Sequence, residues 1–273
     1  MPKLEVRPPK KPYITDQQAL NFHSKPIPGK LALLPTKPMA TQRDLSLAYS
    51  PGVAVPVEAI AKDPDLVYDY TSKGNMVAVI SNGTAILGLG NLGAMASKPV
   101  MEGKSVLFKR FADIDSFDIE VEEEEAQAFI ECVKRFGNTF GGINLEDIGS
   151  PECFIIEQEL RDYLDIPVFH DDQHGTAIIA TAGLINAAHL TGRKFEDMKV
   201  VLSGAGAAGL SVLGLIKSLG VKKENAIVLD SKGVVYEGRK EYMDQWKAPH
   251  AVKTDMRTSV SYTHLTLPTI LLV

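Results

Sequence analysis

The sequence is poor in cysteine, in excess positive charge and in long apolar runs. Its 273 residues include two cysteines, Cys132 and Cys153, without CxxC spacing, which argues against a disulfide scaffold or a structural zinc site. The net charge of -5 argues against a nucleic-acid partner, because no basic excess is present to neutralise phosphates. No apolar run reaches the roughly 18 residues of a membrane helix. Residues 1–13 lack the apolar core of a signal peptide, so we expect a cytoplasmic protein without a membrane partner.

Two pairs of acids follow short apolar segments that predict buried strands. Asp171 and Asp172 come after residues 166–169, and Glu146 and Asp147 come after residues 143–145. Strand ends above helix starts are where α/β proteins place their chemistry. Acids in this position also cap helices. Because an acid pair follows a short apolar strand twice in this chain, we expect both pairs to converge on one divalent cation.

Two stretches match the GxGxxG pattern of dinucleotide-binding turns. The second, residues 204–209, follows an apolar strand at 199–202 and precedes a helix predicted for 210–219. A further strand ends on Asp230, 26 positions after Gly204, which suits an acid that binds the ribose. The first match, residues 88–93, is expected to follow a strand that starts at 85–87. Pro99 is expected to disturb any helix that follows this match. We interpret its glycines as a tight turn near a substrate or cofactor.

Two residues are chemically suggestive and ambiguous on their own. Tyr49 precedes a Ser-Pro-Gly turn, where a tyrosine is most often a packing residue. Lys104 has apolar neighbours on both sides, which allows an inward-facing base, but a surface lysine lying along a helix fits the same spacing. On spacing alone, a packing role is favoured for Tyr49 and a surface position is favoured for Lys104.

Five ordered stretches together resemble the malic enzymes of bacteria, the decarboxylating malate dehydrogenases that usually prefer NADP. The resemblance runs from about Phe22 to Arg257 and rests on residues 47–56, 81–104, 141–151, 168–177 and 203–211. It implies an α/β fold with an N-terminal malic-enzyme domain followed by a Rossmann-like, doubly wound dinucleotide-binding domain. We expect a catalytic and dimerisation domain at 1–172, a partial dinucleotide domain at 173–258 and a non-matching tail at 259–273.

The resemblance also implies roles for particular residues. Tyr49 and Lys104 are expected to be catalytic, as acid and base. Metal ligands are expected among Glu146, Asp147, Asp171 and Asp172, for Mg²⁺ or Mn²⁺. Cofactor contacts are expected from the turn and the following strand: Gly204, Gly206, Ala207, Ala208, Gly209, Asp230 and Lys232. Ala85 stands where some relatives carry an arginine that meets the substrate carboxylate, so carboxylate recognition is expected from elsewhere.

The expected reaction is the oxidative decarboxylation of (S)-malate to pyruvate and CO₂ with reduction of NADP or NAD. Asp230 would favour NAD, whereas Lys232 would suit the 2′-phosphate of NADP. We expect a homodimer or higher homo-oligomer. Residues 259–273 contain no Asp, Glu, Lys or Arg, and the dinucleotide domain is expected to be C-terminally truncated. The alternatives are another metal-dependent 2-hydroxyacid dehydrogenase, or a catalytically inactive fragment that only dimerises.

Overall fold

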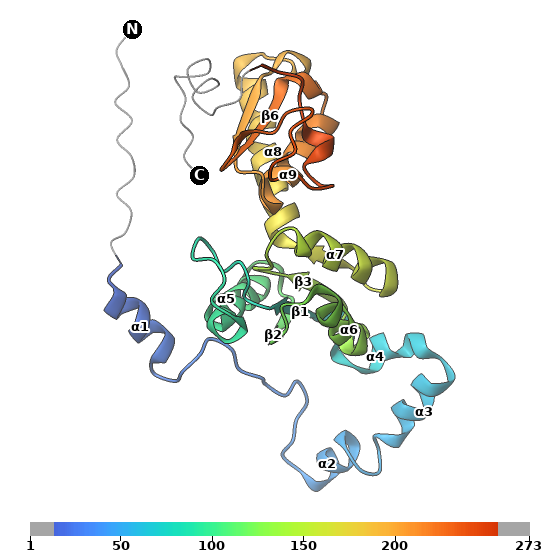
Figure 1. Ribbon diagram of the computed structural model, residues 1–273. Coiled ribbons are helices and arrows are strands. Elements are labelled where there is room, and N and C mark those ends of the chain that lie inside the picture. The colour runs from blue at the N-terminus through green and yellow to red at the C-terminus, as the bar shows by residue number, and fades with distance from the viewer. Residues whose placement is uncertain (1–13, 256–273) are drawn as a thin grey trace.

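The computed structural model describes residues 14–255 (Figure 1). The expectations for residues 1–13 and for the tail at 259–273 therefore lie outside the described residues. No helix of the described part combines the length and the apolar character that crossing a membrane requires.

The first half of the chain is built on a four-stranded parallel sheet. Its strands are β1 (Met76–Ser81), β2 (Asp115–Glu120), β3 (Gly142–Leu145) and β4 (Val168–His170), in the order β2-β1-β3-β4. Parallel strands need crossover helices, and these are α5 (Ala94–Ala112), α6 (Ala126–Phe136) and α7 (Glu152–Tyr163). All four strands end at one edge, so the residues after them meet there.

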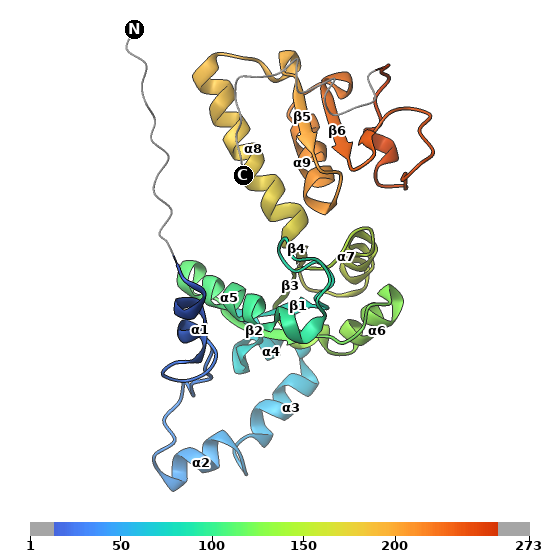
Figure 2. The same ribbon diagram turned by 60° about the vertical axis from the view of Figure 1, so that its left-hand side comes forward.

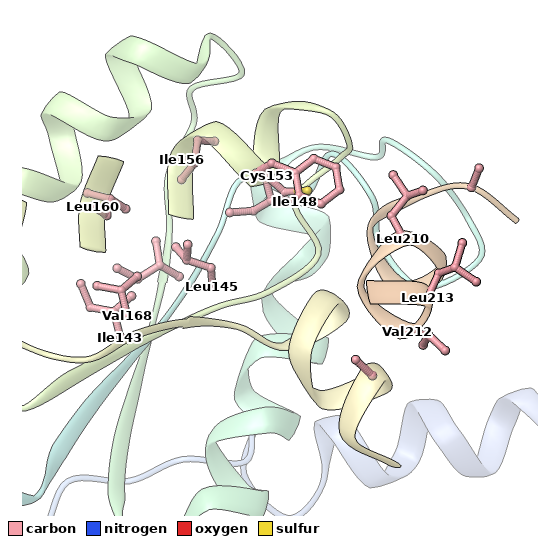
Figure 3. Close-up of a cluster of buried hydrophobic side chains, with 14 of the residues drawn as sticks. Ile143, Leu145, Ile148, Cys153, Ile156, Leu160, Val168, Leu210, Val212 and Leu213 are labelled. Atoms are coloured by element: carbon pink, nitrogen blue, oxygen red, sulfur yellow. The ribbon is translucent and has the colours of Figure 1, made fainter. Parts of the chain in front are cut away.

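The sheet core is continuous with the core of the second unit. Ile143, Leu145 and Val168 from the sheet belong to the same buried cluster as Leu210 and Leu213 (Figure 3). Phe154 of α7 also stacks on Trp246, with ring centroids 4.7 Å apart. The two units therefore share an apolar boundary in addition to the helix that joins them.

That joining helix, α8 (Asp171–Thr191), leads into a three-stranded sheet in the order β5-β6-β7 (Figure 2). Strands β5 (Val200–Ser203) and β6 (Ala226–Asp230) are parallel and are connected by α9 (Ala207–Ser218), whereas β7 (Gly233–Val234) is antiparallel to β6. This β-α-β unit is the building element of a doubly wound nucleotide fold, of which each half contains three parallel strands. The predicted α/β class with a partial Rossmann-like unit is confirmed.

The N-terminal segment forms an arm outside the sheet. It contains α1 (Asp16–Ser24), α2 (Gln42–Ala48), α3 (Ala54–Lys62) and α4 (Val67–Tyr70), and both views place α2 and α3 away from the sheet (Figures 1 and 2). None of residues 14–75 is buried. Short 3₁₀ turns complete the described chain: Pro64–Leu66, Ser72–Asn75, Gly137–Thr139, Phe195–Asp197, Lys223–Asn225 and Ala248–His250.

Some sequence-based boundaries were wrong. Residues 85–87 form no strand, because Leu87 has a φ of 50° and Ile86 bonds back to Gly90. Helix α5 runs through Pro99, since its buried Ala94 and Met101 hold it to the sheet despite the missing N–H donor. Helix α8 begins at Asp171 rather than at residue 173 or later.

Candidate active site

The two predicted acid pairs meet at the carboxyl edge of the first sheet. Leu145 of β3 and His170 of β4 are register partners, so the residues that follow each strand emerge side by side. Oxygens of Glu146, Asp147 and Asp172 lie within 4.8 Å of one another. The fourth acid, Asp171, is not in this group and points to Lys104 instead. The structure thus brings three of the four predicted metal ligands together.

These three acids lack enough positive charge around them. Burial raises the pKa of Glu146 to about 7, although Lys104 and Asn144 oppose the shift. Burial and the charge of Asp147 raise the pKa of Asp172 to about 6. Burial also raises the pKa of Asp147, whose Oδ2 atom is buried without a hydrogen-bond partner. Crowded carboxylates with a free buried oxygen are satisfied by a cation.

The donor set is suited to a hard divalent ion. Three carboxylates from two adjacent strand ends offer only oxygen, which Mg²⁺ and Mn²⁺ prefer over the nitrogen and sulfur ligands of zinc sites. The convergence is possible because parallel strands deliver both acid pairs to the same edge. The residues present therefore fit a magnesium or manganese ion.

Lys104 lies beside this cluster on α5. Its Nζ atom is 2.7 Å from Asp171 Oδ2 and 3.2 Å from Glu146 Oε2. Burial disfavours the charge of Lys104, but the hydrogen bond to Asp171 and the charge of Glu146 outweigh burial and raise its pKa. A cavity of about 310 Å³ adjoins Lys104 and Asp171, with apolar walls that include Phe108 and Phe169. Lys104 is therefore an inward-facing, charged lysine at a cavity.

The loop just before the first glycine-rich stretch contacts the acid cluster. The backbone N–H of Leu87 donates to Asp147 Oδ1 at 3.2 Å, and that of Ala85 donates to the Asp147 carbonyl at 3.0 Å. A Cβ on Gly83 would lie 2.2 Å from the carbonyl oxygen of Gly93, so only glycine permits this fold of the loop. Residues 85–87 therefore fix Asp147, whereas a Cβ on Gly88, Gly90 or Gly93 would meet nothing within 4 Å, and the role of these glycines stays a prediction.

Two polar residues of the site were missed from the sequence. Asn144 donates from Nδ2 to Glu146 Oε2 at 2.8 Å, and Glu157 contacts the corner that carries Asp171 and Asp172. Asn144 lies inside a strand and Glu157 inside a helix, where spacing gives no signal. A buried polar residue in an apolar strand was the available hint for Asn144.

The second glycine-rich stretch forms the turn between β5 and α9. Gly204 has a φ of 117°, and Gly206 caps the helix that Ala207 and Ala208 begin. A Cβ on Gly209 would lie 1.9 Å from the Gly204 carbonyl, so Gly209 permits close packing of helix against strand. A Cβ on Gly204 or Gly206 would meet nothing within 4 Å. The turn therefore leaves open space at a helix N-terminus, as a pyrophosphate requires.

The acid at the end of β6 is already neutralised by the protein. Asp230 Oδ2 lies 2.6 Å from Arg239 and 3.6 Å from Lys247, and all three side chains are at most 8% exposed. Asp230 Oδ1 accepts the backbone N–H of Lys232 at 2.8 Å, and the Lys232 side chain pairs with exposed Glu241. Burial would raise the pKa of Asp230, but its hydrogen bonds, first that of Arg239, lower it.

Tyr49 is not brought to Lys104 within this chain. It is the C-cap of α2, at the outer part of the arm (Figure 2), and is 78% exposed. Thr41 begins this helix with a capping box, and the turn at Ser50 to Gly52 ends it. The structure thus joins Lys104 to the acid cluster and leaves Tyr49 outside it.

An α/β protein with an acidic cluster, an adjoining lysine and a Rossmann-type turn belongs to the dinucleotide-dependent enzymes in its architecture. Two family models match the chain: "Malic enzyme, N-terminal domain" over residues 28–161 and "Malic enzyme, NAD binding domain" over residues 173–271. The chain belongs to the malic enzyme family, which confirms the predicted resemblance.

Named relatives include both cofactor types. The NADP-dependent malic enzyme of Rhizobium meliloti (strain 1021) is 68% identical over 90% of this chain and 32% of its own length. The NAD-dependent malic enzyme of the same strain is 56% identical over 89% of this chain and 31% of its own. The crystal structure of the Pyrococcus horikoshii malic enzyme superposes with a TM-score of 0.82 at 47% identity, covering 87% of this chain and 56% of that one. The chain thus spans about a third of those curated relatives.

Proposed function

We propose that this chain carries out the oxidative decarboxylation of (S)-malate to pyruvate and CO₂, with a divalent metal and NADP, or NAD in its place. The observation that carries this is the cluster of Glu146, Asp147 and Asp172 with Lys104 3.2 Å from Glu146. The malic enzyme relatives of both cofactor types support the same reaction.

Glu146, Asp147 and Asp172 would hold Mg²⁺ or Mn²⁺, with Asp171 beside them. When bound, the cation would supply a Lewis acid for the hydroxyl and carboxylate of malate, and the nicotinamide would supply a hydride acceptor. The free Oδ2 atom of Asp147 and the raised pKa values of Glu146 and Asp172 support this assignment. Oxidised malate then loses CO₂ and leaves the enolate of pyruvate.

Lys104 acts as the base that takes the proton of the 2-hydroxyl. The Glu146 and Asp171 carboxylates raise its pKa and keep it charged. A cation held by Glu146 would neutralise one of these two negative charges. The pKa of Lys104 would then fall toward that of a working base. Tyr49 donates the proton that C3 of the enolate requires. Lys104 lies at the cavity, whereas Tyr49 is proposed to reach it from a second copy of the chain.

The cofactor preference follows from the state of Asp230. Because Arg239 and Lys247 neutralise this acid, its carboxylate repels a phosphate less than a free aspartate would. Lys232, with a side chain 51% exposed, adds a cation two residues on. We therefore propose NADP as the preferred cofactor, with its pyrophosphate at Gly204, Gly206, Ala207, Ala208 and Gly209.

The chain is further proposed to be a homodimer in which the arm crosses to the second copy. Large apolar side chains of the arm are unburied, among them Phe22, Leu34, Tyr49 and Val55 at 70%, 84%, 78% and 72% exposure. A surface this apolar marks a protein interface. An arm that packs on a second copy would bury it and deliver Tyr49 to that copy's site.

Dimers that mix two variant chains test the catalytic roles of Tyr49 and Lys104. They also test whether the arm reaches the second copy. Tyr49→Phe and Lys104→Ala are each expected to lower kcat by about 10²–10⁴-fold. If Tyr49 acts in the second copy, an equal mixture should recover about a quarter of wild-type turnover, since half the dimers have one intact site. Recovery near zero would place both residues in one chain. Wild-type turnover of Lys104→Ala alone would remove it from the mechanism.

Substrate range separates the alternatives. Turnover with isocitrate or tartrate and none with malate would indicate another metal-dependent 2-hydroxyacid dehydrogenase. Mn²⁺ binding and dimerisation without NADP binding would indicate a dimerising fragment.

We also propose a division between residues 172 and 173, which is supported by the start of the second family-model match at residue 173. The cytoplasmic assignment is supported by Cys132 and Cys153 being free thiols.

A further inference from the structure

Glu157 is a buried acid that the proposed reaction does not use. It lies on α7 and is 6% exposed. Its Oε1 atom accepts the backbone N–H of His170 at 3.1 Å. The Nε2 atom of His174 lies 2.7 Å from Oε1 and 3.0 Å from Oε2. One carboxylate thus holds two points of the chain that are four residues apart.

Those two points flank the acids of the site. His170 ends β4 and is the N-cap of α8, His174 follows in the first turns of α8, and Asp171 and Asp172 lie between them. The side chain of His170 makes no capping hydrogen bond to α8. Glu157 supplies the missing acceptor, and its negative charge suits the positive end of the helix. The strand-to-helix corner is therefore fixed from α7.

The geometry of the acid cluster depends on this corner. Asp172 Oδ2 accepts the backbone N–H of Asp147 at 2.9 Å, which joins the corner to the end of β3. On its other side, Asp171 Oδ2 lies 2.7 Å from Lys104. A rotation of the first turn of α8 would move both carboxylates away from Glu146 and Lys104. Ligand oxygens held in place bind metal more tightly than mobile ones.

We propose that Glu157 is a positioning residue for the metal site, which it orients through His170 and His174. This inference rests on the proposed function, because it assumes that Glu146, Asp147 and Asp172 bind Mg²⁺ or Mn²⁺. Within residues 14–255, Glu157 bonds to His170 and His174 and makes no hydrogen bond or ion pair with Glu146, Asp147, Asp172 or Lys104, so it acts through the corner. Its removal should therefore weaken metal binding without removing a ligand.

The test measures Mn²⁺ binding to the whole chain by the loss of the free-ion EPR signal. Glu157→Ala is expected to raise the Mn²⁺ dissociation constant about 10–100-fold, as loss of an outer partner does. Glu157→Gln keeps one acceptor and should raise it less. Glu159→Gln is the matched control, since Glu159 is on the same helix but its side chain is 40% exposed. It should bind Mn²⁺ as the wild type does.

Thermal unfolding without metal separates positioning from simple stability. A lower midpoint in Glu157→Ala with an unchanged Mn²⁺ dissociation constant would overturn the inference and leave the metal site intact. His174→Gln should raise the constant too, and combining it with Glu157→Gln should add less than the two separate effects. Full additivity would contradict action through His174. If the wild type itself binds no Mn²⁺, the proposed metal site fails, and this inference fails with it.

Discussion

Acids that follow parallel strands are handled differently in the two units. After β3 and β4, Glu146, Asp147 and Asp172 crowd together, and burial raises the pKa of each. After β6, the Asp230 side chain is 5% exposed, but Arg239 and Lys247 lie beside it and its pKa is lowered. All of these acids lie at the ends of parallel strands. Only Asp230 has two cationic side chains beside it.

The difference separates a binding site from a structural contact. Three carboxylates with one lysine are short of positive charge, so an added cation lowers their free energy. Asp230 has two cations and a backbone donor, so it ties β6 to residues 239 and 247 and needs no ligand. Unpaired buried charge therefore marks the chemistry of this protein better than the strand-end acid pattern alone.

The largest effect is expected when one acid of the cluster of Glu146, Asp147 and Asp172 is replaced. Asp172→Asn should weaken Mn²⁺ binding at least about 100-fold, beyond the loss typical of an outer partner. In the metal-free protein at pH 8 the same change should raise the melting temperature, since it removes a crowded charge whose pKa is raised to about 6. Calorimetric titration and melting curves measure both. Exposed Asp165→Asn is the control, and Mn²⁺ binding that survives in Asp172→Asn would contradict the cluster.

The next largest effect is expected when Asp230 loses its ion-pair partner Arg239. Arg239→Leu leaves Asp230 buried beside Lys247 alone, and should lower the free energy of unfolding by about 3 kcal/mol. Urea unfolding measures this. Exposed Arg193→Leu should change little. Adding Asp230→Asn to Arg239→Leu should restore part of the loss, and no restoration would show that Arg239 stabilises the fold by other contacts.

A third buried acid, Glu120, extends the comparison to the pH dependence of stability. Glu120 of β2 pairs with Lys98 at 3.1 Å, yet burial and the hydrogen bond with Asp118 raise its pKa to about 7. A raised acid pKa stabilises the fold fully below its unfolded value, near 4.5, and this contribution is lost as pH rises through about 7.

The metal-free melting temperature of Glu120→Gln should therefore fall less between pH 5 and pH 8 than that of the wild type. Exposed Glu122→Gln should follow the wild type. Parallel curves for Glu120→Gln and the wild type would mean that Lys98 already compensates the charge.

The smallest effect concerns the cofactor. Lys232→Ala should weaken NADP binding about tenfold or less and leave NAD binding unchanged, because one partly exposed cation contributes about 1 kcal/mol. Fluorescence titration with each reduced cofactor measures the ratio. Exposed Lys240→Ala is the control. Equal losses for both cofactors would contradict a contact of Lys232 with the 2′-phosphate.

Much of the fold could be predicted because its signals are local. The apolar segments before Glu146, Asp171 and Asp230 became β3, β4 and β6, and the glycine turn after β5 opened α9. The error at residues 85–87 arose because contacts with Asp147, distant in sequence, decide that loop. Asn144 and Glu157 were missed for the same reason, since their partners lie on other elements.

The sequence by itself determined the α/β class, the membership of the malic enzyme family and the acids that follow the strands, because motifs and apolar periodicity are properties of neighbouring residues. Only the tertiary structure decided which acids are paired. Asp171 went to Lys104 and Asp230 to Arg239, whereas Asp147 kept a free oxygen. Charge balance in a buried site depends on distances between elements, and these exist only after the strands and helices have packed.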